Sequence, residues 1–188
     1  ELELSEDSGV LDAMRERLRV AVKLAGRRIF DKGQEDSEYR GMGTTCLAMW
    51  LGEGNAILAH VGDSRGYLVR SSRIEQLTED HSLVNERIRA GLMSPDEARN
   101  HRLKNVITRS LGYMQEVEVD VQVREVEQGD HFVLCSDGLS NLVEAAEIAE
   151  RVLELGPEDA SRSLIALACE RGGDDNITVV VARVDEVN

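Results

Sequence analysis

Carboxylate side chains occupy three corners of this sequence, where an apolar segment meets a turn. Asp137 follows one apolar run after a single serine, Asp174 and Asp175 precede another run, and Glu79 and Asp80 stand at the third corner. Mg²⁺ and Mn²⁺ prefer oxygen ligands at fixed angles, which acids at the ends of rigid strands can provide. Aspartate also ends strands as an ordinary turn former or cap, so a divalent-cation site and a purely structural role are both open.

Other catalytic chemistries find less support in the sequence. No G-x-S-x-G segment occurs, so the strained turn that presents a nucleophilic serine is absent. The segment 41–45 has the glycines of a phosphate-binding loop but lacks its lysine. His60 and His131 lie in apolar runs, where a structural role is expected. His81 could either orient Asp80 or cap the helix that follows.

Charge and composition exclude several classes of partner. The chain has 36 acidic and 22 basic residues and a formal charge of −14 at pH 7. Nucleic acids and anionic membranes select clustered lysine and arginine, so neither is expected as the main partner. Aromatic residues make up 3% of the chain, too few for a base-stacking surface, and we therefore expect no nucleic-acid partner.

The cysteines and the ends of the sequence bear on its location. Cys46, Cys135 and Cys169 are far apart, so we expect free buried thiols rather than a zinc site. Free thiols are typical of a reducing compartment, which favours a cytoplasmic location. No run approaches 18 apolar residues, so no membrane insertion of this domain is expected. The sequence begins at Glu1 without a signal-like segment, and we expect it to be part of a longer chain.

Hydrophobic periodicity predicts a long opening helix followed by alternating strands and helices. Residues 11–29 carry an apolar stripe typical of one helix, which Gly33 is expected to end. Strands are predicted at 44–51, 56–61, 66–70, 117–126, 131–135 and 177–184, and further helices at 82–90, 142–155 and 157–172. The first three strands are joined by tight turns and predict an antiparallel meander. This order predicts a mixed α and β fold of antiparallel sheets flanked by helices.

Six short motifs follow one another along residues 41–181. They are GMGTT at 41–45, VGDSR at 61–65, LTEDHS at 77–82, NVITRSLG at 105–112, LCSDGL at 134–139 and GDDNITVV at 173–180. In this order and spacing they resemble the type 2C, metal-dependent (PPM) family of protein serine/threonine phosphatases, in the compact form of its bacterial branch.

The resemblance implies an α+β fold of two antiparallel β-sheets sandwiched between pairs of helices. It also implies hydrolysis of phosphoserine and phosphothreonine in phosphorylated proteins, opposing a serine/threonine protein kinase. By motif match, Asp137 and Asp175 bind metal, and Asp80 matches the position of a third, weaker ion. The cofactors would be two Mn²⁺ or Mg²⁺ ions that activate a water molecule, so no catalytic side chain is assigned within this sequence.

The segment 83–104 matches the flap beside the active site of this family. Ser94, followed by proline and by Glu97, predicts a capped helix inside this insertion. The resemblance implies that the flap influences substrate choice, and its basic residues could contact an acidic phosphopeptide. They could equally form a solvated helix face. These residues are Arg87, Arg89, Arg99 and Arg102.

The sequence departs from the family pattern at its beginning. Two motifs should precede the opening helix, one with a phosphate-binding arginine and one with an Asp-Gly pair whose aspartate bridges both metals. Neither occurs in residues 1–40. We therefore expect 1–188 to be a single phosphatase-like domain that is incomplete at its N-terminus, and weakly active or inactive as it stands. Alternatives are a degenerate relative that binds phosphoproteins without cleaving them, or strands supplied by another chain.

Overall fold

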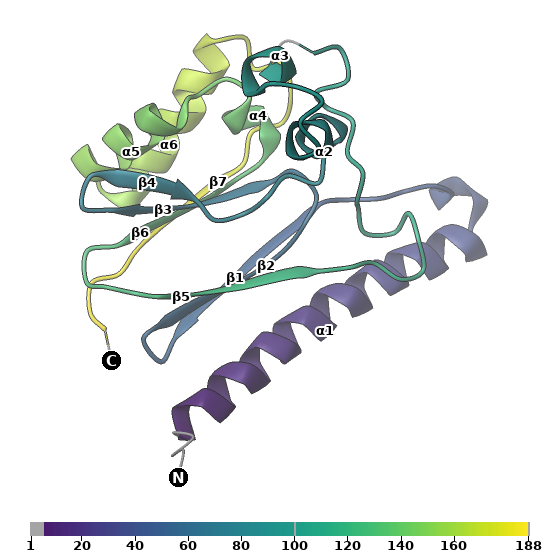
Figure 1. Cartoon of the computed structure of the whole chain (residues 1–188), viewed down its shortest axis with the longest axis horizontal. Coiled ribbons are helices and arrows are strands. Elements are labelled where there is room, and N and C mark those ends of the chain that lie inside the picture. Colours follow the sequence, from purple (N-terminus) through teal and green to yellow (C-terminus); the bar gives the residue numbers. More distant parts are fainter. Residues whose placement is uncertain (1–5, 100, 188) are drawn as a thin grey trace. The chain divides into compact units, whose positions relative to one another are not determined.

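The computed structural model describes residues 6–99 and 101–187 (Figure 1). The chain groups into two compact units. The first unit takes residues 1–49, 57–63 and 80–123 of the chain, and the second takes residues 50–56, 64–79 and 124–188. Each unit has its own apolar core. Among the described residues, no helix has the length and apolar character needed to cross a membrane.

One long helix packs against a three-stranded sheet, most of whose strand residues fall in the first unit. The helix is α1 (Glu6–Glu35), and the strands are β1 (Cys46–Gly52), β2 (Asn55–Val61) and β5 (Asp120–Glu125), in the order β1-β2-β5. Its core joins helix and strand residues, namely Val22, Ala59, Val61, Leu111 and Val119. Removing these apolar side chains from water is the main term that holds α1 against the sheet.

Gly26 lies on the buried side of α1. Ala21 and Ala25 belong to the apolar stripe predicted over residues 11–29 but are exposed, whereas Gly26 is buried, and a β-carbon there would lie 3.2 Å from Leu111 Cδ2. The predicted helix end at Gly33 is wrong, because α1 continues to Glu35. A β-carbon on Gly33 would lie 3.0 Å from the carbonyl oxygen of Tyr39. Both glycines therefore allow close approach to α1, and neither ends the helix.

The second unit is built on a four-stranded antiparallel sheet with helices beside it. The strands are β3 (Arg65–Arg70), β4 (Arg73–Gln76), β6 (His131–Cys135) and β7 (Val179–Arg183), in the order β4-β3-β6-β7. The helices are α4 (Asp137–Ser140), α5 (Ala145–Glu154) and α6 (Pro157–Glu170). Strand β6 is central, because Val133 pairs with Tyr67 of β3 and with Val181 of β7.

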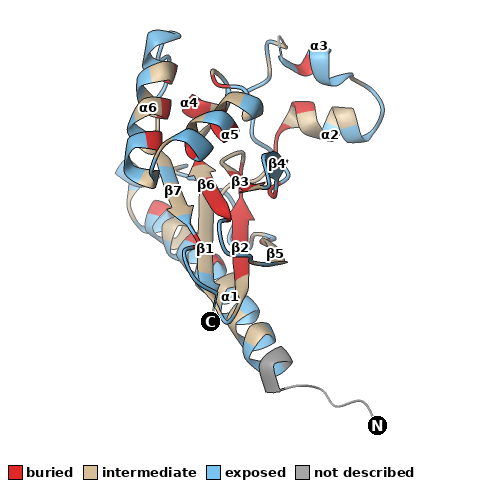
Figure 2. Ribbon diagram, turned by 90° about the vertical axis from the view of Figure 1, so that its left-hand side faces the viewer, coloured by how far each residue is buried: buried red, intermediate tan, exposed pale blue. Residues whose placement is uncertain are grey.

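The core of the second unit lies between its sheet and the pair α5 and α6. Ile148 and Val152 of α5 and Leu164 of α6 are fully buried against Val133 and its neighbours. The buried residues of α6 lie on one side of the helix, and its other side is exposed (Figure 2). The amphipathic patterns of these helices thus fix which of their faces meet the sheet.

The predicted three-stranded meander is wrong. β1 and β2 are neighbours in one sheet, but β3 belongs to the other sheet and pairs there with β4 and β6. The apolar runs of β2 and β3 are buried almost throughout, so their pattern does not show which strand lies beside them. The turn between them contains Gly62, which has a φ of 113° that favours glycine.

The predicted fold class is confirmed: the chain is mixed α+β with two antiparallel sheets. Strand β4 and the short helix α4 were not predicted, because four-residue elements carry too little periodicity to stand out. The three cysteines are free, as predicted. Their predicted burial holds for Cys135 but is wrong for Cys169, which is exposed.

Candidate metal centre

Asp137 lies at the point where the central strand of the second unit ends. β6 ends at Cys135, Ser136 occupies the N-cap position of α4, and Asp137 is the first residue of α4. The carboxylate is half-buried, and Asn141 Nδ2 lies 3.4 Å from its Oδ2. An acid at the first turn of a helix, directly after a buried strand, has little freedom of backbone movement.

The hydroxyl of Ser136 ties this turn to the segment that carries Asp175. Ser136 Oγ donates to the carbonyl oxygen of Asn176 at 3.0 Å and accepts from the amide of Thr178 at 3.0 Å. The amide of Ser136 also donates to the carbonyl oxygen of Thr178 at 3.1 Å. Asp137 and Asp175 each adjoin one of these bonded residues. The structure therefore brings the two predicted ligands onto adjacent segments.

The two segments pass so close that only glycine fits at position 138. A β-carbon built on Gly138 would lie 2.5 Å from the carbonyl oxygen of Asn176, a distance that β-carbons essentially never show. Gly138 is buried in the first turn of α4, so the conflict would have to be relieved by movement of backbone. The glycine after Asp137 thus sets how near its turn lies to the Asp175 segment.

Asp175 stands in an exposed turn between α6 and β7. Gly172 and Gly173 precede it with φ values of 128° and 58°, and the Asp175 Oδ1 accepts from the amide of Asn176 at 2.6 Å. Asp174 lies beside it in the same exposed turn. Carboxylates on two adjacent segments, open to solvent, form the all-oxygen donor set that Mg²⁺ and Mn²⁺ prefer. The carboxylates of the Asp137 and Asp175 segments therefore fit a hard divalent cation.

Asp80 belongs to the first unit, where its segment is held by local hydrogen bonds. Its side chain is half-buried, and its carbonyl oxygen accepts from Asn85 Nδ2 at 2.8 Å. The amide of His81 donates to the carbonyl oxygen of Gly62 at 2.8 Å. The role of Asp80 as a ligand of a third ion stays a prediction.

The first unit contains a cluster that the sequence did not indicate. His60, His81 and Asp120 each offer one potential ligand atom, and these atoms lie within 4.8 Å of one another. The imidazole rings of His60 and His81 are in contact, with their centroids 4.5 Å apart and their planes tilted by 32°. His60 is 2% exposed and was expected to be structural, and Asp120 lies in the strand predicted over residues 117–126 without having been singled out.

Hydrogen bonds within this cluster argue against a metal there. The amide of Gly62 donates to His81 Nδ1 at 3.0 Å, so the proton of the neutral ring lies on Nε2, which contacts Asp120 Oδ2 at 3.1 Å. Arg109 Nη1 donates to Asp120 Oδ1 at 2.8 Å and lies 3.0 Å from His81 Nε2. A guanidinium therefore already provides the positive charge beside Asp120 that a cation would supply.

The same contacts shift the pKa of two members of the cluster. Burial raises the pKa of Asp120, but hydrogen bonds from His81 and Arg109 outweigh this and hold it below its usual value. Burial lowers the pKa of His60, and the nearby His81 lowers it further. The cluster thus places the two histidines beside the Arg109–Asp120 ion pair, and its hydrogen bonds connect the His81 segment to Gly62.

Acidification is expected to destabilise the fold because His60 is held in its neutral form. Below an unfolded-state pKa of about 6.5 the unfolded chain takes up a proton that the folded chain resists. The free energy of unfolding therefore falls as the pH drops, by at most about 1.4 kcal/mol per pH unit for this residue. Thermal unfolding between about pH 7.5 and about pH 5.5 measures the slope. His60→Gln, which retains a donor for the carbonyl of Gly62, should reduce it; an unchanged slope would contradict the assignment.

The predicted flap is helical, as expected. It contains α2 (Leu83–Arg89), capped by Ser82, and α3 (Pro95–Arg99). The predicted capping box is present, because Glu97 Oε2 accepts from the amide of Ser94 at 2.8 Å and the amide of Glu97 donates to Ser94 Oγ at 3.3 Å. The substrate-contact candidates lie on or beside these helices, with Arg87 half-buried and Arg89, Arg99 and Arg102 exposed.

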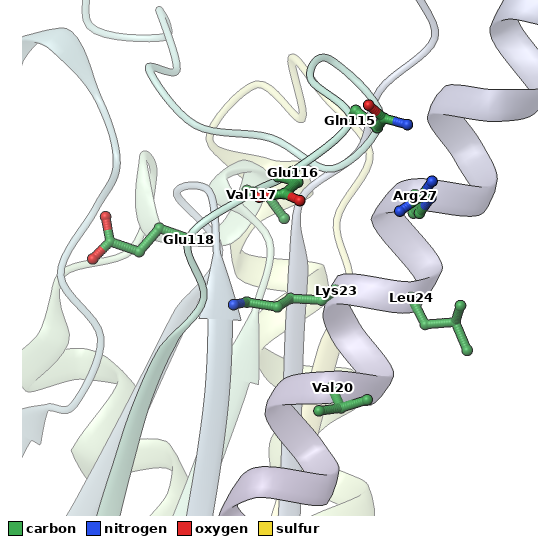
Figure 3. A pocket seen from close by; sticks show the side chains of 8 residues that line it. All are labelled: Val20, Lys23, Leu24, Arg27, Gln115, Glu116, Val117 and Glu118. Atoms are coloured by element: carbon green, nitrogen blue, oxygen red, sulfur yellow. The ribbon is translucent and has the colours of Figure 1, made fainter.

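A cavity of about 500 Å³ lies in the first unit, between α1 and residues 115–118 (Figure 3). Val20 and Leu24 supply apolar surface, and Lys23 extends toward the 115–118 segment. Glu116 and Glu118 also line it. None of the predicted metal or flap residues is among the residues that line this cavity.

Comparison with known proteins gives consistent matches over most of the chain. A family model described as protein phosphatase 2C matches residues 3–177. The protein phosphatase PhpP of Streptococcus pneumoniae is 40% identical over 177 residues, which are 94% of this chain and 72% of that protein. A serine/threonine phosphatase structure from S. agalactiae is 43% identical and has a TM-score of 0.87, covering 98% of this chain and 74% of that one. The catalytic domain of the phosphatase PstP in complex with two manganese ions is 36% identical, with a TM-score of 0.83 over 91% of this chain and 71% of that one.

Proposed function

The chain belongs to the protein phosphatase 2C family, and from this premise we propose that it hydrolyses phosphoserine and phosphothreonine in proteins at a two-metal centre. One observation supports this most directly. Ser136 is hydrogen bonded to both Asn176 and Thr178, which sets the carboxylate-bearing segments of Asp137 and Asp175 side by side.

In this proposal Asp137 and Asp175 bind two Mn²⁺ or Mg²⁺ ions, and Asp80 binds a third, weaker one. When bound, such a pair of ions lowers the pKa of water and neutralises charge on the transferring phosphoryl group. The protein's part is to hold the carboxylates at set positions, through the Ser136 tie and the close approach at Gly138. The two manganese ions in the PstP structure support the metal requirement.

The proposal extends to the flap and the partners. Arg87, Arg89, Arg99 and Arg102 would contact acidic residues around the phosphorylated site, a role that positive charge on short helices suits. The substrates would be cytoplasmic phosphoproteins, and a serine/threonine protein kinase would be the functional counterpart.

A second candidate is a module that binds phosphoproteins without hydrolysing them. Residues 1–40 contain neither an R-x-x-N-x-D nor a D-G-x-G segment, the two metal- and phosphate-binding motifs expected before α1. We therefore propose that the 188-residue chain is weakly active or inactive. A missing carboxylate that bridges the two metals should reduce activity by more than the 10–100-fold typical of replacing an outer-sphere residue.

Phosphate release from a phosphothreonine peptide, with Mn²⁺ and with a chelator, tests both candidates. Weak turnover that the chelator abolishes is expected of the enzyme. Absence of turnover, together with Mn²⁺-dependent binding of the peptide, would favour the binding module. Turnover that persists in chelator would contradict the metal-dependent mechanism.

A further inference from the structure

The guanidinium of Arg171 contacts two different parts of the second unit. Arg171 directly follows α6, and its Nη1 donates to the carbonyl oxygen of Leu142 at 2.9 Å. Nη1 and Nη2 also donate to the two carboxylate oxygens of Glu147, each at 2.7 Å. This two-point geometry fixes the orientation as well as the distance of the pair, which a single-point contact does not.

Each acceptor belongs to a segment that leads back to Asp137. The amide of Asn141 donates to the carbonyl oxygen of Asp137 at 2.9 Å, and Leu142 is the next residue. Glu147 lies in the first turn of α5 and closes the capping box with Glu144, so its carboxylate is itself held. Arg171 is therefore hydrogen bonded to Leu142, at the C-terminal end of the segment that begins at Asp137.

Arg171 is also close in sequence to Asp175. Three residues separate them, including Gly172 and Gly173, whose positive φ values give a sharp reversal after α6. The amide of Gly173 donates to the carbonyl oxygen of Ala168 at 3.1 Å, which is typical of a glycine that ends a helix. Glycine has more conformational freedom than other residues, so the position of Asp175 depends on how firmly the chain is held on either side.

We infer that Arg171 is a positioning residue for the carboxylate pair, acting at the opposite end of the Asp175 turn from Ser136. Ser136 is hydrogen bonded to Asn176 and Thr178, on the C-terminal side of the turn. Arg171, on its N-terminal side, is hydrogen bonded to Leu142 and Glu147. The turn is thereby fixed at both ends to the segment of Asp137. This inference rests on the proposed function, since it takes Asp137 and Asp175 as the metal ligands.

The ion pair persists across the pH range in which such a centre would work. The hydrogen bond from Arg171 lowers the pKa of Glu147 to about 2, and the amide of Glu144 contributes. A carboxyl whose pKa is lowered by folding loses that stabilisation only as the pH falls from its ordinary value near 4.5 toward about 2. Metal affinity should therefore show no step from this pair near neutral pH.

The experiment compares Arg171→Met with Arg162→Met in the 188-residue protein. Arg162 lies on α6, the helix that Arg171 follows, and donates to Glu158 at 2.6 Å; this i,i+4 pair is exposed and lies within α6. Amide hydrogen exchange measures the mobility of residues 172–178, and the electron paramagnetic resonance of Mn²⁺ measures its binding. Arg171→Met is expected to speed exchange and to weaken Mn²⁺ binding about 10-fold, the lower end of the effect of outer-sphere partners. Arg162→Met should change neither.

Two further variants make each outcome decisive. Arg171→Lys keeps the charge but not the two-point contact, so it should give intermediate exchange and affinity, and it carries the test if Arg171→Met does not fold. If the Arg171 variants match Arg162→Met in both measurements, the inference is wrong while the metal centre stands. If Asp137→Asn binds Mn²⁺ as well as the unaltered protein does, the proposed centre fails and the inference fails with it.

Discussion

Replacing Asp137 by asparagine is expected to weaken Mn²⁺ binding by at least about 100-fold and to abolish metal-dependent phosphate release, since a lost ligand should exceed the effect of outer-sphere partners. Asparagine has nearly the same shape, so β6, α4 and the contact with Asn141 should remain. It lacks the negative charge that a hard divalent cation requires. Calorimetric titration with Mn²⁺ and a phosphopeptide assay measure the two effects.

The matched control for this variant is Asp12→Asn, which removes the same charge from an exposed position of α1. It separates loss of a ligand from the change in net charge of an already acidic protein. The control should bind Mn²⁺ as the unaltered protein does. Equal binding by the Asp137 and Asp12 variants would contradict the assignment of Asp137 as a ligand.

Replacing Gly138 by alanine is expected to separate the two carboxylate segments. The added β-carbon would lie 2.5 Å from the carbonyl oxygen of Asn176, and a backbone oxygen cannot rotate away as a long side chain can. Such overpacking costs about 1–3 kcal/mol of unfolding free energy, and the shift should also lower Mn²⁺ affinity. Denaturant unfolding measures the first effect and metal titration the second.

Gly156→Ala is the control for the Gly138 variant. Gly156 precedes α6, and a β-carbon there would meet no atom within 4 Å. Its unfolding free energy should change by less than about 1 kcal/mol. If Gly138→Ala keeps both the stability and the Mn²⁺ affinity of the unaltered protein, the close approach at this position does not control the centre.

Local chemistry made much of this molecule predictable. The Ser94–Glu97 capping box is present as expected, and Asp137 follows a buried strand as its apolar neighbours indicated. The sequence also placed Asp175 a few residues before the strand β7, although only the family resemblance paired it with Asp137. These features depend on residues close together in the chain, where side-chain type decides the conformation.

Contacts between distant segments could not be predicted in the same way. The bond from His81 to Asp120 spans 39 residues, and that from Ser136 to Asn176 spans 40. Arg109 also contacts both His81 and Asp120, although nothing in its local sequence marks it as a partner of a histidine. Similarly, β3 is not part of the expected meander, since it pairs with β4 and β6 in the other sheet. The apolar run of β3 does not indicate which strands are its partners.

The order of strands in the second sheet has a consequence for the newly made chain. β6 pairs with β7, and the residues between them contain α4, α5 and α6, so Asp137 leaves the ribosome well before Asp175. The register that aligns Cys135 with Val179 cannot form until the last strand has been synthesised. Metal binding at the proposed centre should therefore follow the synthesis of β7, and a nascent chain halted before β7 should leave Asp137 without its partner segment.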